Sequence, residues 1–260
     1  MSEDTPIRPA ATILLVRDEP EFEVLMVKRH HQIDFASGAL VFPGGKTDPG
    51  DHDPAWAELC VGWAEIDAGQ RPLRVAAIRE AFEEAGILIA RHPSGEVFHG
   101  DKRAVSARIA VSKGERSLMD LVNELGLWLD IGALTVFAHW ITPSLMPKRF
   151  DTWFYVVRAN SDQLAVCDGW ETVDAEWIAP CEALRLAEAG QRKVIFPTRM
   201  NLQLLAESES GEDAVRRAGL RTLVTVQPKL EQREGGPVLV IPEAAGYGAV
   251  AEPLSAISGA

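Results

Sequence analysis

The apolar positions at the start of the chain predict a β-hairpin followed by a short third strand. Residues 11–16 (ATILLV) and 22–28 (FEVLMVK) are apolar, β-prone runs, and the charged, proline-containing segment between them is typical of a hairpin turn. Residues 39–42 (ALVF) predict another strand. We expect residues 43–45 (PGG) to end it, because proline lacks a backbone donor and glycine favours irregular backbone.

The strongest helical pattern covers residues 73–85 (LRVAAIREAFEEA). Pro72 precedes this segment and Gly86 follows it, which is the punctuation expected at the two ends of a helix. Residues 87–90 (ILIA) then predict a buried strand. Residues 51–71, on the other side of the helix, are only weakly amphipathic, and we expect a helical insertion there.

Downstream, helical and strand-like segments alternate. The helical segments are 115–129, 181–189 and 197–207. The strand-like segments are 134–142, 152–158 and 172–178, followed by a predicted strand pair in the tail at 221–226 and 237–241. This order predicts an α/β (α+β) fold, in which a mixed β-sheet is sandwiched between helices and carries a C-terminal extension.

Composition and charge narrow the class of function. The 260 residues are 47% hydrophobic and 25% charged, which suits one large globular domain with additions. The net charge of −12 argues against a protein that coats nucleic acids or binds anionic membranes. It does not argue against a phosphate-bearing small molecule, because a bound cation can invert the local field.

The cysteines and the N-terminus set further expectations. Cys60, Cys167 and Cys181 form no CxxC pair, which argues against a disulfide framework or a zinc site. The histidines, including the pair His30-His31, show no spacing of metal ligands. No signal peptide and no apolar run of membrane-spanning length is visible, so we expect a cytoplasmic protein.

The predicted helix at 73–85 carries three clustered acids. Residues three and four apart share a helix face, so Glu80 should lie beside Glu83 and Glu84. Like charges at this spacing repel by a few tenths of a kcal/mol per pair. A hard cation such as Mg²⁺ or Mn²⁺ would turn that repulsion into ligation, since both prefer oxygen ligands. The alternative is a solvated acidic face, although acids late in a helix oppose its dipole.

A glycine-rich loop, residues 44–51 (GGKTDPGD), favours the metal site over the solvated acidic face. Together with residues 79–87 (REAFEEAGI) it resembles the Nudix box, G-x5-E-x7-R-E-U-x-E-E-x-G-U, in which U is aliphatic. Asp51 stands in place of the first glutamate, and Ala81 in place of a bulkier aliphatic residue. Between Asp51 and Arg79 lie 27 residues where the family usually has seven.

This interval looks like an insertion, about residues 52–71, and it is similar to one in a Nudix branch that includes peroxisomal coenzyme A diphosphatases. Residues 140–143 (WITP) and 149–152 (RFDT) also resemble that branch. An upstream pattern of coenzyme A-cleaving members is matched at Leu25, Arg29, Gly38, Phe42, Pro43, Gly44 and Gly45. Asp34, however, stands where the pattern has a second arginine, which removes a phosphate-binding cation.

The resemblance implies roles for the residues of the box. Glu83 and Glu84 would be the main metal ligands, and Glu80 would ligate the metal or deprotonate the attacking water. Arg79 would hold Glu80 through a charge-assisted hydrogen bond. Asp51 would be an outer ligand, and the carbonyl of Gly44 or Gly45 would complete the shell of Mg²⁺ or Mn²⁺.

Weaker candidates lie outside the helix. Substrate contacts are assigned to Arg29, Gly45, Arg149 and Glu176, with Lys148 beside Arg149. Glu171 and Asp174, near Glu176, are alternatives for a further base or ligand, against the simpler reading of a solvated acidic edge. Trp140 and Trp153 have the chemistry to stack on a base, but core packing is the favoured role.

The sequence thus predicts an N-terminal tail (1–9), a Nudix-like domain (10–206, with a variable helical segment at 92–130) and an extension (207–260). The predicted function is metal-dependent hydrolysis of a diphosphate linkage in a nucleoside-diphosphate-linked small molecule, with coenzyme A or an acyl derivative as the leading substrate. The alternative is a non-catalytic Nudix-fold module that senses a nucleotide or binds a protein. The oligomeric state is left open, with a homodimer as one option.

Overall fold

The computed structural model describes residues 6–29, 38–159, 163 and 172–254. In chain order, the strands are β1 (Ile7–Arg17), β2 (Glu23–Arg29), β3 (Leu40–Val41), β4 (Gly44–Lys46), β5 (Ala90–Arg91), β6 (Trp128–Leu129), β7 (Thr135–Ile141), β8 (Arg149–Arg158), β9 (Thr172–Ile178), β10 (Thr225–Val226), β11 (Lys229–Arg233), β12 (Gly236–Val240) and β13 (Ala251–Pro253). The α-helices are α1 (Arg71–Ala85), α2 (Lys102–Ser112), α3 (Leu118–Leu125), α4 (Pro180–Glu188), α5 (Phe196–Leu205) and α6 (Gly211–Leu220). Short 3₁₀ helices lie at η1 (Pro49–His52), η2 (Pro54–Glu58), η3 (Ile131–Ala133) and η4 (Glu243–Ala245).

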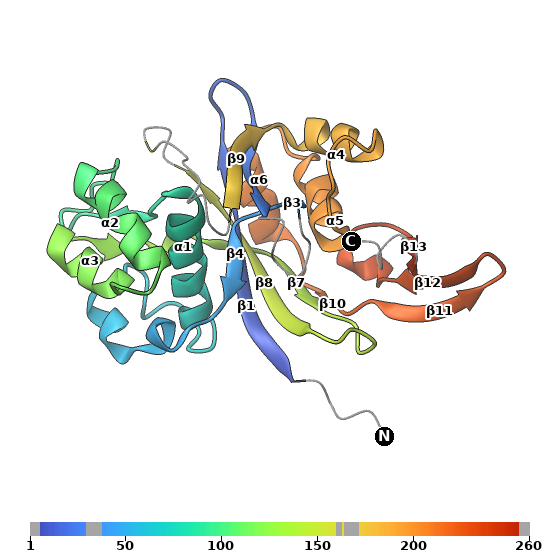
Figure 1. Ribbon diagram of the computed structural model, residues 1–260, viewed down its shortest axis with the longest axis horizontal. Helices are drawn as coiled ribbons and strands as arrows, with labels where there is room; N and C mark the ends of the chain where they lie inside the picture. The colour runs from blue at the N-terminus through green and yellow to red at the C-terminus, as the bar shows by residue number, and fades with distance from the viewer. Residues whose placement is uncertain (1–5, 30–37, 160–162, 164–171, 255–260) are drawn as a thin grey trace.

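The main sheet is mixed, as the sequence predicts. Its order is β10-β7-β8-β1-β2-β3, and β4 and β9 pair with β1 and β2 respectively (Figure 1). Strand β1 runs parallel to β8 and antiparallel to both β2 and β4. The predicted N-terminal hairpin is confirmed, with Val16 opposite Val24.

Alternating side chains of β1 build a core on each face of the sheet. Ile13 and Leu15 point into one core, which they share with α1, α2 and α3. Leu14 and Val16 point into the other, which they share with α4, α5 and α6. In Figure 1 the two helical groups lie on opposite sides of the sheet. The predicted sandwich of a mixed sheet between helices is therefore confirmed.

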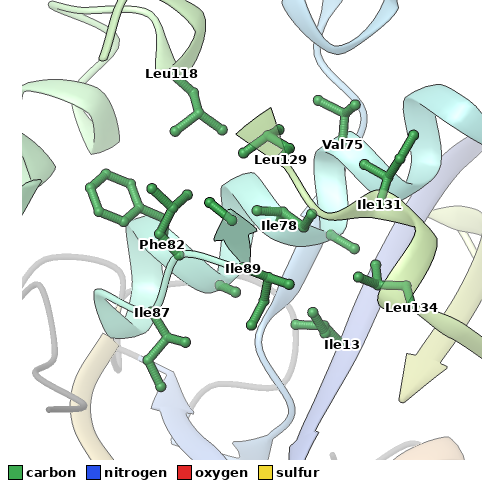
Figure 2. Close-up of a cluster of buried hydrophobic side chains, with 14 of the residues drawn as sticks. Ile13, Val75, Ile78, Phe82, Ile87, Ile89, Leu118, Leu129, Ile131 and Leu134 are labelled. Atoms are coloured by element: carbon green, nitrogen blue, oxygen red, sulfur yellow. The ribbon is translucent and has the colours of Figure 1, made fainter. Parts of the chain in front are cut away.

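Helix α1 is anchored by the first core. Ile78 and Phe82 are at most 1% exposed and lie in one cluster with Ile13 of β1 and Leu129 of β6 (Figure 2). Burial of such a side chain contributes roughly 1.5–3 kcal/mol. Apolar packing on this side therefore fixes the helix and leaves its acidic flank free to face the glycine loop.

The residues at both ends of α1 have the roles that the sequence predicts. Pro72 occupies the first turn, where its missing N–H costs no hydrogen bond. Gly86 ends the helix in the left-handed conformation at φ 74°, which glycine adopts without steric strain. Its N–H donates to the carbonyl of Phe82 at 2.9 Å.

The insertion differs from the expected helical one. Residues 52–70 contain no α-helix; they form the 3₁₀ helix η2, the end of η1 and a series of turns. Pro54 starts η2, and Gly62 turns the chain at φ 81°. The excursion is pinned to the loop by Trp56, which is 2% exposed and whose indole Nε1–H donates to the carbonyl of Gly50 at 2.9 Å.

Two local strand predictions need correction. Residues 43–45 do follow the end of β3 at Val41, as expected, but Gly44–Lys46 then forms a separate strand, β4, which pairs with β1 (Gly44 opposite Thr12). This pairing is close, and it suits glycine because there is no side chain to separate the backbones. Residues 87–90 are buried, as expected, but the strand there is only Ala90–Arg91, paired with β6.

The predicted strand pair in the tail is wrong. Thr225–Val226 (β10) joins the main sheet beside β7, whereas β12 pairs with β11 and β13 in a separate sheet. Strand β11 is exposed at every residue, so it carries no apolar pattern to detect. Helix α6 was not predicted either, although Ser210 caps it by accepting from the N–H of Asp213. No helix in the described part of the chain is long and apolar enough to cross a membrane.

Candidate metal centre

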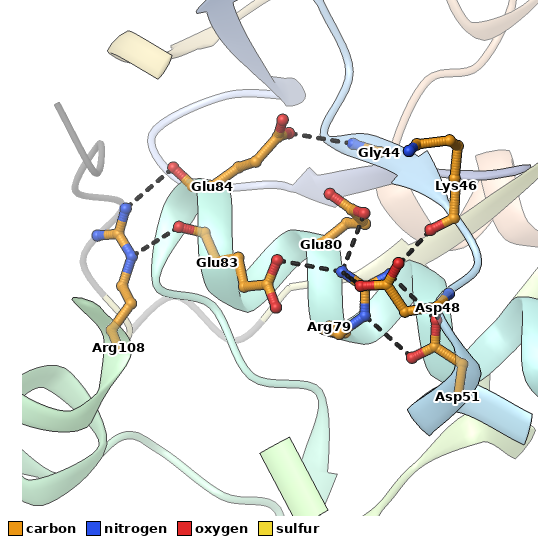
Figure 3. Close-up of polar contacts among 9 residues, drawn as sticks. All are labelled: Gly44, Lys46, Asp48, Asp51, Arg79, Glu80, Glu83, Glu84 and Arg108. Atoms are coloured by element: carbon orange, nitrogen blue, oxygen red, sulfur yellow. Dashed lines mark hydrogen bonds and ion pairs between the residues drawn. The ribbon is translucent and has the colours of Figure 1, made fainter. Parts of the chain in front are cut away.

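The glycine loop and helix α1 meet at Arg79. Its Nε and Nη2 donate to the two carboxylate oxygens of Asp51, at 2.9 and 3.0 Å (Figure 3). Its Nη1 donates to Glu80 Oε1 at 3.0 Å and to Glu83 Oε2 at 3.1 Å. Its Nη2 also donates to the carbonyl of Lys46 at 2.9 Å. Asp51 thus lies at the acid cluster in spite of the 27 residues between it and Arg79, as the resemblance to the Nudix box implies.

The network around Arg79 is buried. The side chains of Arg79 and Asp51 are 10% and 3% exposed. Burial alone lowers the pKa of Arg79, but Glu80, Asp51 and Glu83 outweigh it and raise the pKa above its ordinary value. Arg79 therefore stays charged, and it neutralises part of the acidic cluster.

The carboxylate of Glu83 lies largely buried beside two other acids. Burial raises the pKa of Glu83 to about 8; Arg79 opposes this rise, whereas Glu80 and Asp51 add to it. At neutral pH the metal-free site thus favours a proton at this carboxylate. A divalent cation would neutralise the same carboxylate.

The glycines bring the loop within reach of the acids. The N–H of Gly44 donates to Glu84 Oε2 at 3.1 Å. At Gly45, an added Cβ would lie only 2.2 Å from Glu80 Oε1. Neither glycine has a positive φ, so the requirement is for space and not for an unusual backbone conformation. Glu80 therefore occupies the volume that any other residue at position 45 would fill.

The donor set fits a hard divalent cation after a change of rotamer. Among the described residues no three His, Cys, Asp or Glu side chains converge on one point. Glu80 and Glu83 turn toward Arg79, and Glu84 turns toward Gly44. Rotation of Glu80 and Glu83 would leave Arg79 with its two bonds to Asp51 and would present carboxylate oxygens from one flank of α1.

Of the weaker candidates, Arg149 and Glu176 do not join this cluster. Arg149 is buried in β8, where Nε donates to the carbonyl of Thr142 at 3.2 Å. Glu176 pairs with Met26, whose side chain lies in the core under α4–α6, so Glu176 faces away from α1. Its carboxylate contacts Arg192 at 3.3 Å. Their substrate-binding roles stay predictions.

The structure does not describe several other residues, or side chains, that the sequence singled out. Arg29 belongs to β2, but its side chain is not among those described. Asp34, Glu171, Cys167 and the pair His30-His31 lie outside the described residues.

The two tryptophans singled out in the sequence pack within the fold. Trp140 is 4% exposed and donates to the hydroxyl of Tyr247 at 3.0 Å, which agrees with the favoured role in core packing. Trp153 stacks on His139 with 4.1 Å between ring centroids.

One residue near the site was missed. Arg108 of α2, 6% exposed, donates from Nε to the carbonyl of Glu83 at 3.0 Å and from Nη2 to the carbonyl of Glu84 at 3.1 Å (Figure 3). The sequence offered no signal, because residues 92–114 have no clear apolar pattern and backbone carbonyls are the same in every residue.

An acid-bearing helix clamped to a glycine loop, on a mixed sheet between helices, defines the Nudix class of fold. The family model described as "NUDT19 Nudix domain" matches residues 67–202, just over half of the chain, and the model described as "NUDIX domain" matches residues 6–116. The chain belongs to the Nudix family.

The relatives agree with this placement. "Acyl-coenzyme A diphosphatase NUDT19" of Xenopus laevis is 26% identical over 206 residues, 63% of this chain and 54% of that protein. The Homo sapiens protein of the same name is 28% identical over 204 residues, 62% of this chain and 54% of that protein. The chain thus spans about half the length of these curated relatives. A solved NUDIX hydrolase from Alicyclobacillus acidocaldarius has a TM-score of 0.71 and 29% identity, over 82% of this chain and 97% of that one.

Proposed function

We propose that this chain is a Mg²⁺- or Mn²⁺-dependent diphosphatase. The observation that carries the proposal is that the two halves of the Nudix box lie together. Arg79 binds Asp51 across 27 intervening residues, and Glu80 fills the space that Gly45 leaves. A structural ion pair alone would not require three further acids at this helix end. Their mutual repulsion is a cost that ligation of a cation offsets.

Each residue has a task in this proposal. Glu83 and Glu84 hold the cation, and Glu80 ligates it or accepts the proton of the attacking water. Arg79 holds Glu80 through the bond at Nη1 in the metal-free site, and its pairing with Asp51 keeps the guanidinium in place when Glu80 turns toward the cation. The cation supplies a lowered pKa for water and neutralises charge on the diphosphate.

We further propose coenzyme A or an acyl derivative as the leading substrate. The two relatives described above bear the name acyl-coenzyme A diphosphatase, and the insertion and residues 140–143 are similar to that branch. Asp34 opposes this choice, because an acid near a phosphate-rich ligand repels it. At an effective dielectric of about 20, two unit charges about 4 Å apart interact by roughly 4 kcal/mol before salt screening.

The test is competition kinetics among coenzyme A, an acyl-coenzyme A, ADP-ribose, NADH and diadenosine polyphosphates, with Mg²⁺, Mn²⁺ or EDTA. We expect turnover only with the cation, and the highest kcat/KM for the coenzyme A compounds. Full activity in EDTA would refute the metal-dependent mechanism. Binding of a nucleotide without any product would favour the non-catalytic sensing module.

The variant Asp34→Arg separates the substrate from the general activity. It should raise kcat/KM for coenzyme A and change that for ADP-ribose less. A wild-type protein that ignores coenzyme A, with no gain in the variant, would leave only the diphosphatase assignment.

A further inference from the structure

We infer that Arg108 is a positioning residue for the metal site, acting through the backbone of Glu83 and Glu84. The inference rests on the proposed metal-dependent function. Arg108 belongs to α2, outside both halves of the Nudix box, and it donates to the backbone carbonyls of both expected main ligands.

The end of α1 explains why these carbonyls need a partner. The last four carbonyls of a helix receive no hydrogen bond from an N–H group of the same helix. The turn at Gly86 satisfies the carbonyl of Phe82, to which the N–H of Gly86 donates at 2.9 Å. The left-handed turn then takes the chain away, and Arg108 supplies donors to the carbonyls of Glu83 and Glu84 in place of the next helical N–H groups.

Each of the two ligand residues is consequently held at two points. Glu84 has its carbonyl on Arg108 and its carboxylate on the N–H of Gly44. Glu83 has its carbonyl on Arg108 and its carboxylate on Arg79. The last turn of a helix otherwise frays, and a frayed turn would leave both carboxylates to be ordered by the cation itself. Arg108 therefore lowers the ordering cost of binding a cation.

Arginine suits this position better than lysine. Its planar guanidinium offers donors in a fixed fork, which here reaches two successive carbonyls, whereas a lysine ammonium is a single flexible point charge. A cation at a helix C-terminus is also favourable to the helix dipole. An added Cβ at Gly86 would lie 3.4 Å from Arg108 Nη1, so the guanidinium packs directly against the helix end.

The test is titration of the full chain with Mn²⁺, followed by calorimetry and by the electron paramagnetic resonance signal of free Mn²⁺. Loss of a residue that orients metal ligands typically weakens metal binding or activity by 10- to 100-fold. We expect Arg108→Ala to weaken Mn²⁺ binding by roughly this factor. Arg108→Lys, which keeps the charge on a single donor nitrogen, should recover part of the affinity; it also serves if the alanine variant does not fold.

A matched control separates positioning from general destabilisation. Gln163 is 8% exposed and makes three hydrogen bonds, two to the backbone groups of Leu88, just beyond the end of α1, and one to the carbonyl of Phe98. Gln163→Ala should lower the melting temperature but leave Mn²⁺ affinity unchanged, because it does not touch the carbonyls of Glu83 and Glu84. A second control, Arg103→Ala, removes an exposed arginine of the same helix whose partner is Asp101.

The outcomes are distinguishable. If Arg108→Ala binds Mn²⁺ like the wild type, or if Gln163→Ala weakens binding as much for the same loss in melting temperature, the positioning role is refuted and the proposed function stands. If the wild-type chain binds no Mn²⁺, the proposed metal site fails and the role of Arg108 fails with it. Selective loss in Arg108→Ala, with partial recovery in Arg108→Lys, supports the inference.

Discussion

Asp51 and Arg79 form a two-pronged ion pair between residues 28 positions apart in the chain. Arg79 Nε lies 2.9 Å from Asp51 Oδ1, and Nη2 lies 3.0 Å from Oδ2. Asp51 also accepts from the N–H of Asp48 at 2.7 Å, which fixes the turn of the loop. The aspartate, one methylene shorter than the glutamate of the family pattern, thus closes the loop onto the helix and completes the site.

We expect Asp51→Ala to destabilise the protein strongly. The substitution leaves the buried guanidinium of Arg79 without its two-pronged partner, and removal of one member of a buried ion pair typically costs about 3–5 kcal/mol. Asp51→Asn, which keeps the size and one acceptor, should cost less. Urea unfolding measures both. The control Glu231→Ala, which breaks an exposed pair with Arg233 on β11, should leave the unfolding midpoint in place; an equally small effect of Asp51→Ala would contradict the structural role.

The acids of α1 should be needed for turnover but not for folding. Loss of a positioned acid or base typically reduces the rate by about 10²–10⁴. We expect Glu80→Gln and Glu84→Gln to lose activity on that order, while their circular dichroism spectra match the wild type. Their metal-free stability should be equal or higher, because repulsion between like charges is relieved. Glu188→Gln, an exposed acid on α4, is the control and should keep full activity. Wild-type turnover in both test variants would refute the assignment.

Local patterns predicted the positions of helices and strands better than they predicted which strands pair. The alternation in β1 and the periodicity of α1 are properties of neighbouring residues, so the hairpin, the helix and its glycine end could be read directly. Pairing in the tail depends on which strand reaches which edge. There, the exposed strand β11 gave no apolar pattern, and β10 joined a strand some 85 residues earlier in the chain.

The same division holds for the site. Arg79, Glu80 and Asp51 could be identified because their side chains form a recognisable motif, and the structure brings them together. Arg108 could not be identified, because it binds backbone carbonyls, which leave no trace in the sequence of their partner. The lack of room for a side chain at Gly45 likewise depends on how the loop folds against Glu80, which the sequence does not show.

The metal-free protein should become less stable as the pH rises from about 5 to about 8. Burial raises the pKa of Glu83 from 4.5 to about 8, so the folded state binds a proton that the unfolded state releases over this range. A raised pKa of this kind gives stability that is fully present below pH 4.5 and is lost as the pH rises through the folded value. Urea unfolding in EDTA at several pH values measures the decline.

The variant Glu83→Gln is the control for this pH dependence. It has no proton to release at this site, so its decline between pH 5 and pH 8 should be shallower by about one proton. Mn²⁺ binding near pH 7 should release protons in the wild type and fewer in the variant, which calorimetry in two buffers detects. Equal slopes in the two proteins would show that Glu83 titrates normally.

Alanine at Gly45 should remove activity but keep the fold. The three atoms nearest to the added Cβ all belong to the carboxylate of Glu80, with Oε1 at 2.2 Å and Cδ at 2.6 Å. This carboxylate is the far end of a flexible side chain, so it can swing away at little cost. We expect Gly45→Ala to unfold at nearly the wild-type urea concentration and to lose about 10²-fold or more in kcat, as for loss of a positioned base.

Alanine at the neighbouring Gly44 should have the opposite effect, because its new Cβ would meet backbone. It would lie 2.6 Å from the carbonyl oxygen of Ala11 and 2.7 Å from Cα of Thr12, within the pairing of β4 with β1. These atoms cannot rotate away, so the strands must separate, and crowding of this kind typically costs about 1–3 kcal/mol. Urea unfolding and kcat measured side by side test the contrast: stability should fall in Gly44→Ala before any specific effect on catalysis, and activity should fall in Gly45→Ala alone at unchanged stability. If both variants lose stability equally, Gly45 serves the strand pairing and does not make room for Glu80.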